Sequence, residues 1–313
     1  MVKLNSRGIE MSFTWIFAII VGISVFIFAF ILISKIIDTG SMQSDAKVAK
    51  EVGVLLNPLE TGFEEGKTSS FSIPTKSRII NKCYTEGNFG RQVINVRQFS
   101  FGKWSTTDVD VGFLNKYIFS NGTTEGKKFY VFAKPFDFPF KISDLIYLTS
   151  SNDEYCFVSA PEDIENELYN LNQANFFTED CREDEDKIQV CFGGSGCDVN
   201  VLYDEGSGSV RKEHEETVYF ETDALMYAAI FSNSETYECQ VKRLMQRVDS
   251  LSQIYMGKIG FSASRGCNSN LNNDLVALRS LANGLGSSSG LNQIKTLSDD
   301  ISEINNYAIC SLW

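Results

Sequence analysis

The chain has 313 residues, of which 43% are hydrophobic and 12% aromatic, and it carries a formal net charge of -12. This composition belongs to a globular protein that can bury a core, so it excludes a disordered or low-complexity chain. Residues 36–313 alone carry -14, because Lys3, Arg7 and Lys35 outnumber Glu10 by two before them, and a domain this acidic excludes nucleic acid as an expected partner.

The most apolar part of the sequence lies close to its N-terminus. No charge occurs between Glu10 and Lys35, and fifteen of the 24 residues between them are Leu, Ile, Val or Phe. A helix of this length spans about 36 Å, more than the roughly 30 Å of a hydrocarbon core. Its side chains favour the bilayer by on the order of 6 kcal/mol in total. We therefore expect residues 12–34 to be retained in the lipid bilayer as an anchor; a cleaved secretory signal, with an apolar core of about 7–15 residues, is the alternative.

Four segments follow from the composition. Residues 1–40 form the membrane anchor and residues 41–69 a stalk and linker, since residues 60–70 are rich in Gly, Glu, Ser and Thr. A β-rich α+β ectodomain is expected over residues 70–232. A C-terminal helical region, a hairpin or small bundle, is expected over residues 233–313.

The ectodomain pattern predicts eight strands and two helices. Runs rich in Ile, Val, Phe and Tyr between turn residues predict strands at 78–84, 92–101, 128–134, 145–150, 155–159, 187–192, 198–203 and 217–221. Pro135 and Pro139 bracket a stretch that is not expected in a central strand, because proline donates no hydrogen bond to the ladder. Helices are predicted over 163–171 and 223–231, and the mixed order favours βα units in the second half.

The C-terminal region shows helical periodicity. One stripe, spaced by four and three residues, contains Tyr237, Val241, Leu244, Val248, Leu251 and Tyr255. A second helix is predicted over residues 271–282 and a third over residues 291–308, with a flexible connector at 284–290. We expect the stripes to face the core.

All cysteines lie after the anchor: Cys83, Cys156, Cys181, Cys191, Cys197, Cys239, Cys267 and Cys310. An even number on one side of a membrane helix favours disulfides in an oxidising compartment. No CxxC pair occurs, and the chain has one histidine, so a zinc site is not expected. The pair that we favour is Cys191–Cys197, as a bridge across a hairpin. Asn121 begins a glycosylation sequon, which agrees with a domain outside the cytoplasm.

One motif suggests a protease. Residues 36–41 (IIDTGS) match the aspartate loop of aspartic proteases, whose chemistry needs two aspartates that share a proton. The chain has no second Asp-Thr/Ser-Gly, and the motif directly follows the membrane segment. The end of a helix with a glycine stop is the better interpretation.

Two further motifs suggest other sites. Residues 193–197 (GGSGC) approach the G-x-S-x-G nucleophile pattern around Ser195, but Cys stands at the last position, and His214 lies in a charged run that predicts a solvated loop. A tight hairpin turn explains the glycines. The acidic run at 179–186 could hold calcium, yet it lacks the alternating spacing and central glycine of a calcium loop. No catalytic residue, cofactor or metal ligand is assigned.

The N-terminal residues 6–13 (SRGIEMSF), which run into the anchor, resemble the class III signals of archaeal type IV pilin-like proteins. In that family a peptidase cuts after the glycine that follows a basic residue, which implies processing between Gly8 and Ile9. Family members commonly carry an acidic residue at the fifth mature position. That position is Phe13 here, whereas Glu10 would be the second.

Residues 127–150 and 237–247 are similar to segments of uncharacterised membrane-anchored surface proteins of archaea, which implies a location but no activity. We expect a single-pass, non-enzymatic surface component that serves a structural, adhesion or binding role and contacts other surface proteins or itself. Two alternatives stay open: an extracytoplasmic enzyme or thiol-redox protein, and an accessory subunit of an envelope or secretion complex.

Overall fold

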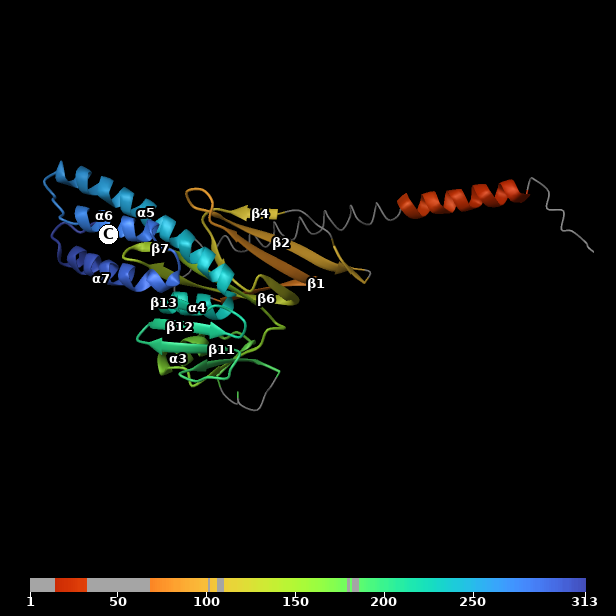
Figure 1. Cartoon of the computed structure of the whole chain (residues 1–313), viewed down its shortest axis with the longest axis horizontal. Helices are drawn as coiled ribbons and strands as arrows, with labels where there is room; N and C mark the ends of the chain where they lie inside the picture. The colour runs from red at the N-terminus through yellow and green to blue at the C-terminus, as the bar shows by residue number, and fades with distance from the viewer. Residues whose placement is uncertain (1–14, 33–67, 101, 106–109, 179–180, 182–185) are drawn as a thin grey trace, which may run out of the picture.

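The structure is a computed structural model that describes residues 15–32, 68–100, 102–105, 110–178, 181 and 186–313 (Figure 1). As predicted, the fold is α+β, with an apolar N-terminal helix, a sheet-rich middle and C-terminal helices. The strands are β1 (Thr68–Tyr84), β2 (Arg91–Ser100), β3 (Lys103–Trp104), β4 (Asp110–Phe113), β5 (Tyr117–Phe119), β6 (Thr123–Asp137), β7 (Lys141–Ser150), β8 (Tyr155–Val158), β9 (Phe176–Phe177), β10 (Ile188–Phe192), β11 (Val199–Asp204), β12 (Ser207–Lys212) and β13 (Val218–Phe220). The helices after the first are α3 (Glu162–Leu171), α4 (Asp223–Phe231), α5 (Ser234–Ala263), α6 (Asn272–Asn283), the short η2 (Ser288–Gly290) and α7 (Leu291–Tyr307).

The N-terminal helix, Trp15–Leu32, has a mean hydropathy of 2.9 over its 18 residues and is long and apolar enough to cross a membrane. None of its residues is buried, whereas a core helix of a soluble protein would be mostly covered. Ser24 donates its hydroxyl hydrogen to the carbonyl oxygen of Ile20 at 2.9 Å, so this polar group is satisfied within the helix.

Two sheets enclose helix α4. The first has the order β3-β2-β1-β6-β7-β5 with β4 beside β2, and the second has the order β13-β12-β11-β10-β8-β9. Helix α4 packs against β6 and β7 of the first sheet and β12 and β13 of the second (Figure 1). All of its residues after Asp223 are buried, which explains a sequence that is apolar on every side. Thr222 caps its N-terminus by accepting a hydrogen bond from the Leu225 backbone N–H at 3.2 Å.

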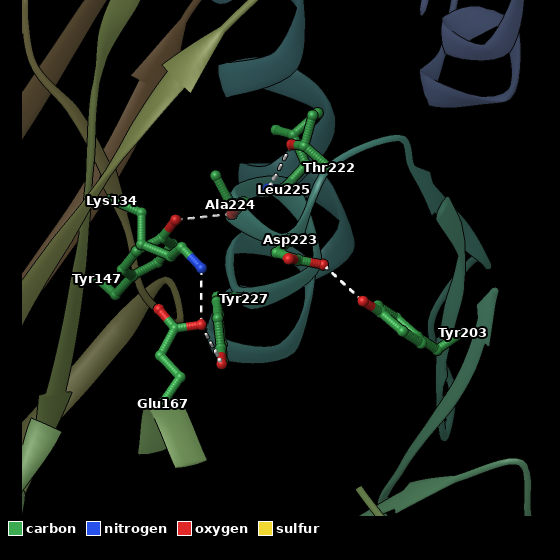
Figure 2. A network of polar contacts seen from close by, with 9 residues as sticks. All are labelled: Lys134, Tyr147, Glu167, Tyr203, Thr222, Asp223, Ala224, Leu225 and Tyr227. Atoms are coloured by element: carbon green, nitrogen blue, oxygen red, sulfur yellow. Dashed lines mark hydrogen bonds and ion pairs between the residues drawn. The ribbon is translucent and has the colours of Figure 1, made fainter. Parts of the chain in front are cut away.

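Polar contacts fix α4 to its neighbours (Figure 2). Lys134 of β6 and Tyr227 of α4 both donate to Glu167 Oε2 of α3, at 2.7 and 3.1 Å. Tyr147 of β7 donates to the carbonyl oxygen of Ala224 at 2.7 Å. Burial raises the pKa of Tyr147 and Tyr227 well above that of a free phenol, so both stay protonated as donors. On the other side, the Tyr203 hydroxyl of β11 donates to Asp223 Oδ1 at 3.0 Å.

The expected βα unit is present. Strands β8 and β9 are parallel neighbours joined by α3, whose Ile164, Leu168 and Leu171 enter the core. The expectation for Pro135 is wrong, because β6 is a central strand and Pro135 pairs with Asp144 of β7. The described pairing of β6 with β1 starts at Thr68↔Phe132, so Pro135 lies beyond it, where a missing N–H is tolerated.

The first sheet curls until its ends meet. Strand β5 lies at one end of the sheet, yet Gln92 of β2 exchanges two hydrogen bonds of 2.8 Å with the backbone of Ile118 in β5. Asn81 of β1 donates to the same carbonyl oxygen at 3.0 Å. These amides satisfy backbone groups on an edge strand. The curl encloses a second apolar cluster of Ile73, Ile79, Ile94, Val96, Ile118, Phe129, Val131, Ala133, Ile146 and Leu148.

Helix α5 crosses this seam. Gln240 donates to the Ile118 carbonyl oxygen at 3.1 Å, and the disulfide Cys83–Cys239 joins β1 to α5. Arg243, which is fully buried, donates to the oxygens of Phe89, Leu114, Lys116 and Gln240 at 3.2, 2.9, 2.9 and 2.6 Å. Burial lowers the pKa of Arg243 to about 10, so the guanidinium stays charged at neutral pH. Its partners among the described residues are carbonyl and amide oxygens.

The C-terminal stripes face the core as predicted. Tyr237, Val241, Leu244 and Val248 of α5 are all buried. Helix α6 packs against α5 and α7 (Figure 1). Their apolar residues join those of both sheets in one continuous cluster that extends from Tyr117 to Leu312.

Candidate binding face

The second sheet has one buried and one open face. Val190, Val199, Val201, Val210 and Val218 alternate along β10 to β13 and are all buried. The residues between them must point the other way, because successive strand side chains alternate. Cross-strand pairs therefore share the open face, namely Asn200↔Arg211, Leu202↔Ser209 and Ser209↔Tyr219.

This open face is hollowed, with a volume of about 980 Å³. The floor contains Asn200, Leu202, Ser209 and Arg211, and the rims are the loops at 194–198 and 213–215. Leu202 is 61% exposed and Tyr219 42% exposed, so the hollow offers apolar surface beside polar groups. A concave face of this kind is a common setting for ligand binding.

The loop at one rim is built by an unusual strand connection. Strands β10 and β11 are parallel, with Val190 opposite Val199, although only residues 193–198 connect them. The chain therefore doubles back within this loop. Gly193 and Gly196 allow this because their φ angles of 72° and 92° favour glycine.

The disulfide Cys191–Cys197 closes the same loop, which confirms the predicted pair. The predicted hairpin is wrong, because the loop folds back beside β10 before β11 begins, so both strands run in one direction. The Asn200 side chain donates to the Cys197 carbonyl oxygen at 2.8 Å, and Asp198 accepts from the Gln189 backbone N–H at 2.8 Å. These amides and carboxylates hold the rim in place.

The groups left to meet a ligand are few. Among the described residues, no hydrogen bond or ion pair engages Arg211, so its guanidinium is available beside the Tyr219 ring and Leu202. At the other rim, the Glu215 carboxylate accepts from the Ser234 backbone N–H at 2.7 Å and thus caps α5. A cation beside an aromatic and an aliphatic side chain suits recognition of a partner with an acidic and an apolar group.

Ser195 and His214 both line this hollow, but nothing prepares them for catalysis. His214 is 89% exposed in its side chain and lies 3.3 Å from Glu213, and within the described part of the chain no hydrogen bond joins it to Ser195. A nucleophile and its base need such contact. The described residues also contain no group of three or more His, Cys, Asp or Glu side chains that could hold a metal ion.

A second hollow of about 730 Å³ lies on the other side of Thr217 and Tyr219, which line both. The disulfide Cys83–Cys239 lies in its wall. Its carboxylates already have structural tasks: Glu238 accepts from the Ser288 backbone N–H at 2.9 Å and so holds η2 against α5. We therefore regard the open sheet face as the candidate site.

No family model, curated protein or solved structure matches the chain. The site is consequently interpreted from its own geometry.

The remaining predicted residues divide into two groups. All eight cysteines are paired, the other disulfides being Cys156–Cys181 and Cys267–Cys310. Asn121 is half-buried at the start of the β5–β6 connection, and its glycosylation stays a prediction. Gly8, Ile9, the motif at 36–41 and most of the acidic run lie outside the described residues.

The binding residues Arg211 and Tyr219 were not predicted. The charged run at 211–216 was interpreted as a loop, whereas Arg211 and Lys212 belong to β12 and point to opposite faces of the sheet. The available indication was Glu205-Gly206 between two alternating segments, a two-residue turn in which both residues have positive φ.

Lys212 gives a pH-dependent prediction. Its ammonium donates to the Ser232 carbonyl oxygen at the C-terminal end of α4, and burial lowers its pKa to about 8. The unfolded chain then binds more protons between pH 8 and the ordinary lysine value near 10.4, so the free energy of unfolding should rise with pH in that window, by on the order of 3 kcal/mol. Urea unfolding at several pH values should show this rise, and Lys212→Met should remove it. An unchanged pH dependence in the variant would contradict the assignment.

Proposed function

We propose that this chain is a single-pass membrane protein of the cell surface, whose domain lies outside the cytoplasm and acts by binding rather than by catalysis. The carrying observation is the combination of one uncovered apolar helix with four disulfides in the domain that follows it. Disulfides persist in oxidising compartments, which supports an extracytoplasmic domain.

The open face of the second sheet supports the binding role, because its free groups recognise a partner but have no catalytic arrangement. The alternative of a thiol-redox protein loses support, since the structure contains no free cysteine. Membership of a pilin-like class, with a mature start at Ile9, remains part of the proposal; mass spectrometry of the purified N-terminus tests it.

Extraction with alkaline carbonate tests the anchor. The native chain should remain in the membrane pellet. Ile23→Arg with Ile27→Arg should release it, because each arginine near the helix centre costs about 2.5–3.5 kcal/mol and the pair offsets the total of roughly 6 kcal/mol that favours insertion.

Ile23→Leu with Ile27→Leu changes the same positions without charge and should stay in the pellet. Release of the native chain by carbonate would refute the anchor.

A further inference from the structure

The first sheet has a basic end. Arg78 and Arg97 are directly opposed on β1 and β2, and Phe99 is opposed to Trp104 on β3. Alternate residues of a strand share a face, so Arg97 and Phe99 point away from the enclosed cluster that contains Val96. We use "basic end" for the cations Lys76, Arg78, Arg97, Lys103, Lys127 and Lys128 together with Phe99 and Trp104.

This charge is opposite to that of the chain as a whole. Six cations gather here, against the three nearest carboxylates on the paired strands and the adjoining turn, Glu125, Asp153 and Glu154. The complete chain carries -12. Such segregation of one sign of charge creates a local field that attracts an anionic partner.

Several of these cations lack a counter-ion. Glu125 accepts from Arg78 Nε at 2.5 Å and also pairs with Lys76, and the hydrogen bonds from both lower its pKa. Within the described ranges Arg97 contacts only the Asn95 side-chain oxygen, at 3.3 Å, and Lys103 has no charged partner. Because like charges directly opposed on neighbouring strands are destabilising, an anion over Arg78 and Arg97 would relieve the pair.

Exposed aromatic rings lie among the cations. The Trp104 ring lies 5.2 Å from the Phe99 ring and 3.9 Å from the Arg78 guanidinium carbon. Phe99 is 38% exposed although it is large and apolar. Aromatic rings beside lysine and arginine are characteristic of surfaces that rest in the headgroup region of a bilayer.

The basic end is also where the chain arrives from the anchor. Strand β1 is antiparallel to β2, with Ser77 opposite Gln98, so the C-terminal end of β2 and the N-terminal end of β1 lie at the same end of the sheet. Residues 33–67 connect Leu32 to Thr68, and at full extension they reach on the order of 120 Å. The tether therefore presents this end of the sheet to the membrane that holds the anchor.

We propose that the basic end docks on the anionic headgroups of the bilayer that holds the N-terminal helix, and so orients the open face of the second sheet. This rests on the proposed membrane anchoring. The sequence directly before Thr68 contains Glu60, Glu64 and Glu65, which lie outside the described residues, so the contact is assigned to the strands rather than to the linker.

Lysine acetylation of the full chain in lipid nanodiscs tests the docking. Discs of phosphatidylcholine alone are compared with discs that also contain phosphatidylglycerol, and mass spectrometry follows each lysine. Lys103 and Lys76 should react about threefold more slowly in the anionic discs, and this protection should disappear in high salt. Lys242 and Lys295, on α5 and α7, should react equally in both.

Arg97→Gln with Lys127→Gln should abolish most of the protection of Lys103, whereas Arg211→Gln with Arg265→Gln, which removes the same charge elsewhere, should leave it. Equal reactivity of Lys103 in the two kinds of disc would overturn the docking. A chain that does not co-elute with either disc would instead refute the anchor, so the two failures are distinguishable.

Discussion

Arg243→Ala should lower the free energy of unfolding by about 3–5 kcal/mol, because it removes the guanidinium that satisfies oxygens on three segments of the first sheet and on α5. Arg243→Lys should recover only part of the loss, since an ammonium cannot reproduce the planar fork. Urea unfolding of the purified protein in detergent measures both.

Arg247 supplies the control for this prediction. It lies one turn further along α5 and donates to a single carbonyl oxygen, that of Ile142, at 2.8 Å. Arg247→Ala should cost about 1 kcal/mol. Equal losses at Arg243 and Arg247 would show that α5 does not hold the seam.

Removal of the disulfide Cys83–Cys239 should have the other large effect. It closes a loop with a sequence separation of 156, and the chain-entropy treatment gives a contribution of about 5 kcal/mol for a loop of this length. The double variant Cys83→Ser with Cys239→Ser should therefore melt at a much lower temperature, or fail to fold.

The bridge Cys191–Cys197 is the matched comparison. Its separation is only 6, for which the same treatment gives about 2 kcal/mol. Cys191→Ser with Cys197→Ser should thus remain folded and lose less than half as much stability. A larger loss for the short bridge would contradict an entropic role for the long one.

Elements whose sequence pattern is local were predicted well. Helix α4 has the predicted bounds, because an apolar run follows the cap at Thr222 and ends before Ser232. The stripes of α5 to α7 also proved to face the core, because a period of 3.6 residues survives in the sequence whatever the helix packs against.

Elements that depend on distant partners were missed. Strand β5 has three residues, and its backbone is held by Gln92 and Asn81 from other strands. Strand β1 begins at Thr68, inside the predicted linker, because β6 pairs with a segment that has little strand propensity of its own.

The seam and the candidate site needed the tertiary structure. Gln240 and Arg243 are polar, and nothing in the helical period alone marks them as buried. The open face combines three strands, of which β12 was not predicted, so the pairing of Asn200 with Arg211 could not be derived from the sequence. The disulfide Cys191–Cys197 was predictable because the two cysteines are close in sequence, whereas the direction of the second strand was not.

Thiol alkylation of the full chain in intact cells tests most directly whether the folded domain lies outside the cytoplasm. Without reductant, none of the eight cysteines should react with a membrane-permeant maleimide, and after an impermeant reductant they should react with an impermeant maleimide. Cysteines that react with the permeant reagent in untreated cells, and are protected from the impermeant one after reduction, would contradict an extracytoplasmic, disulfide-bonded domain.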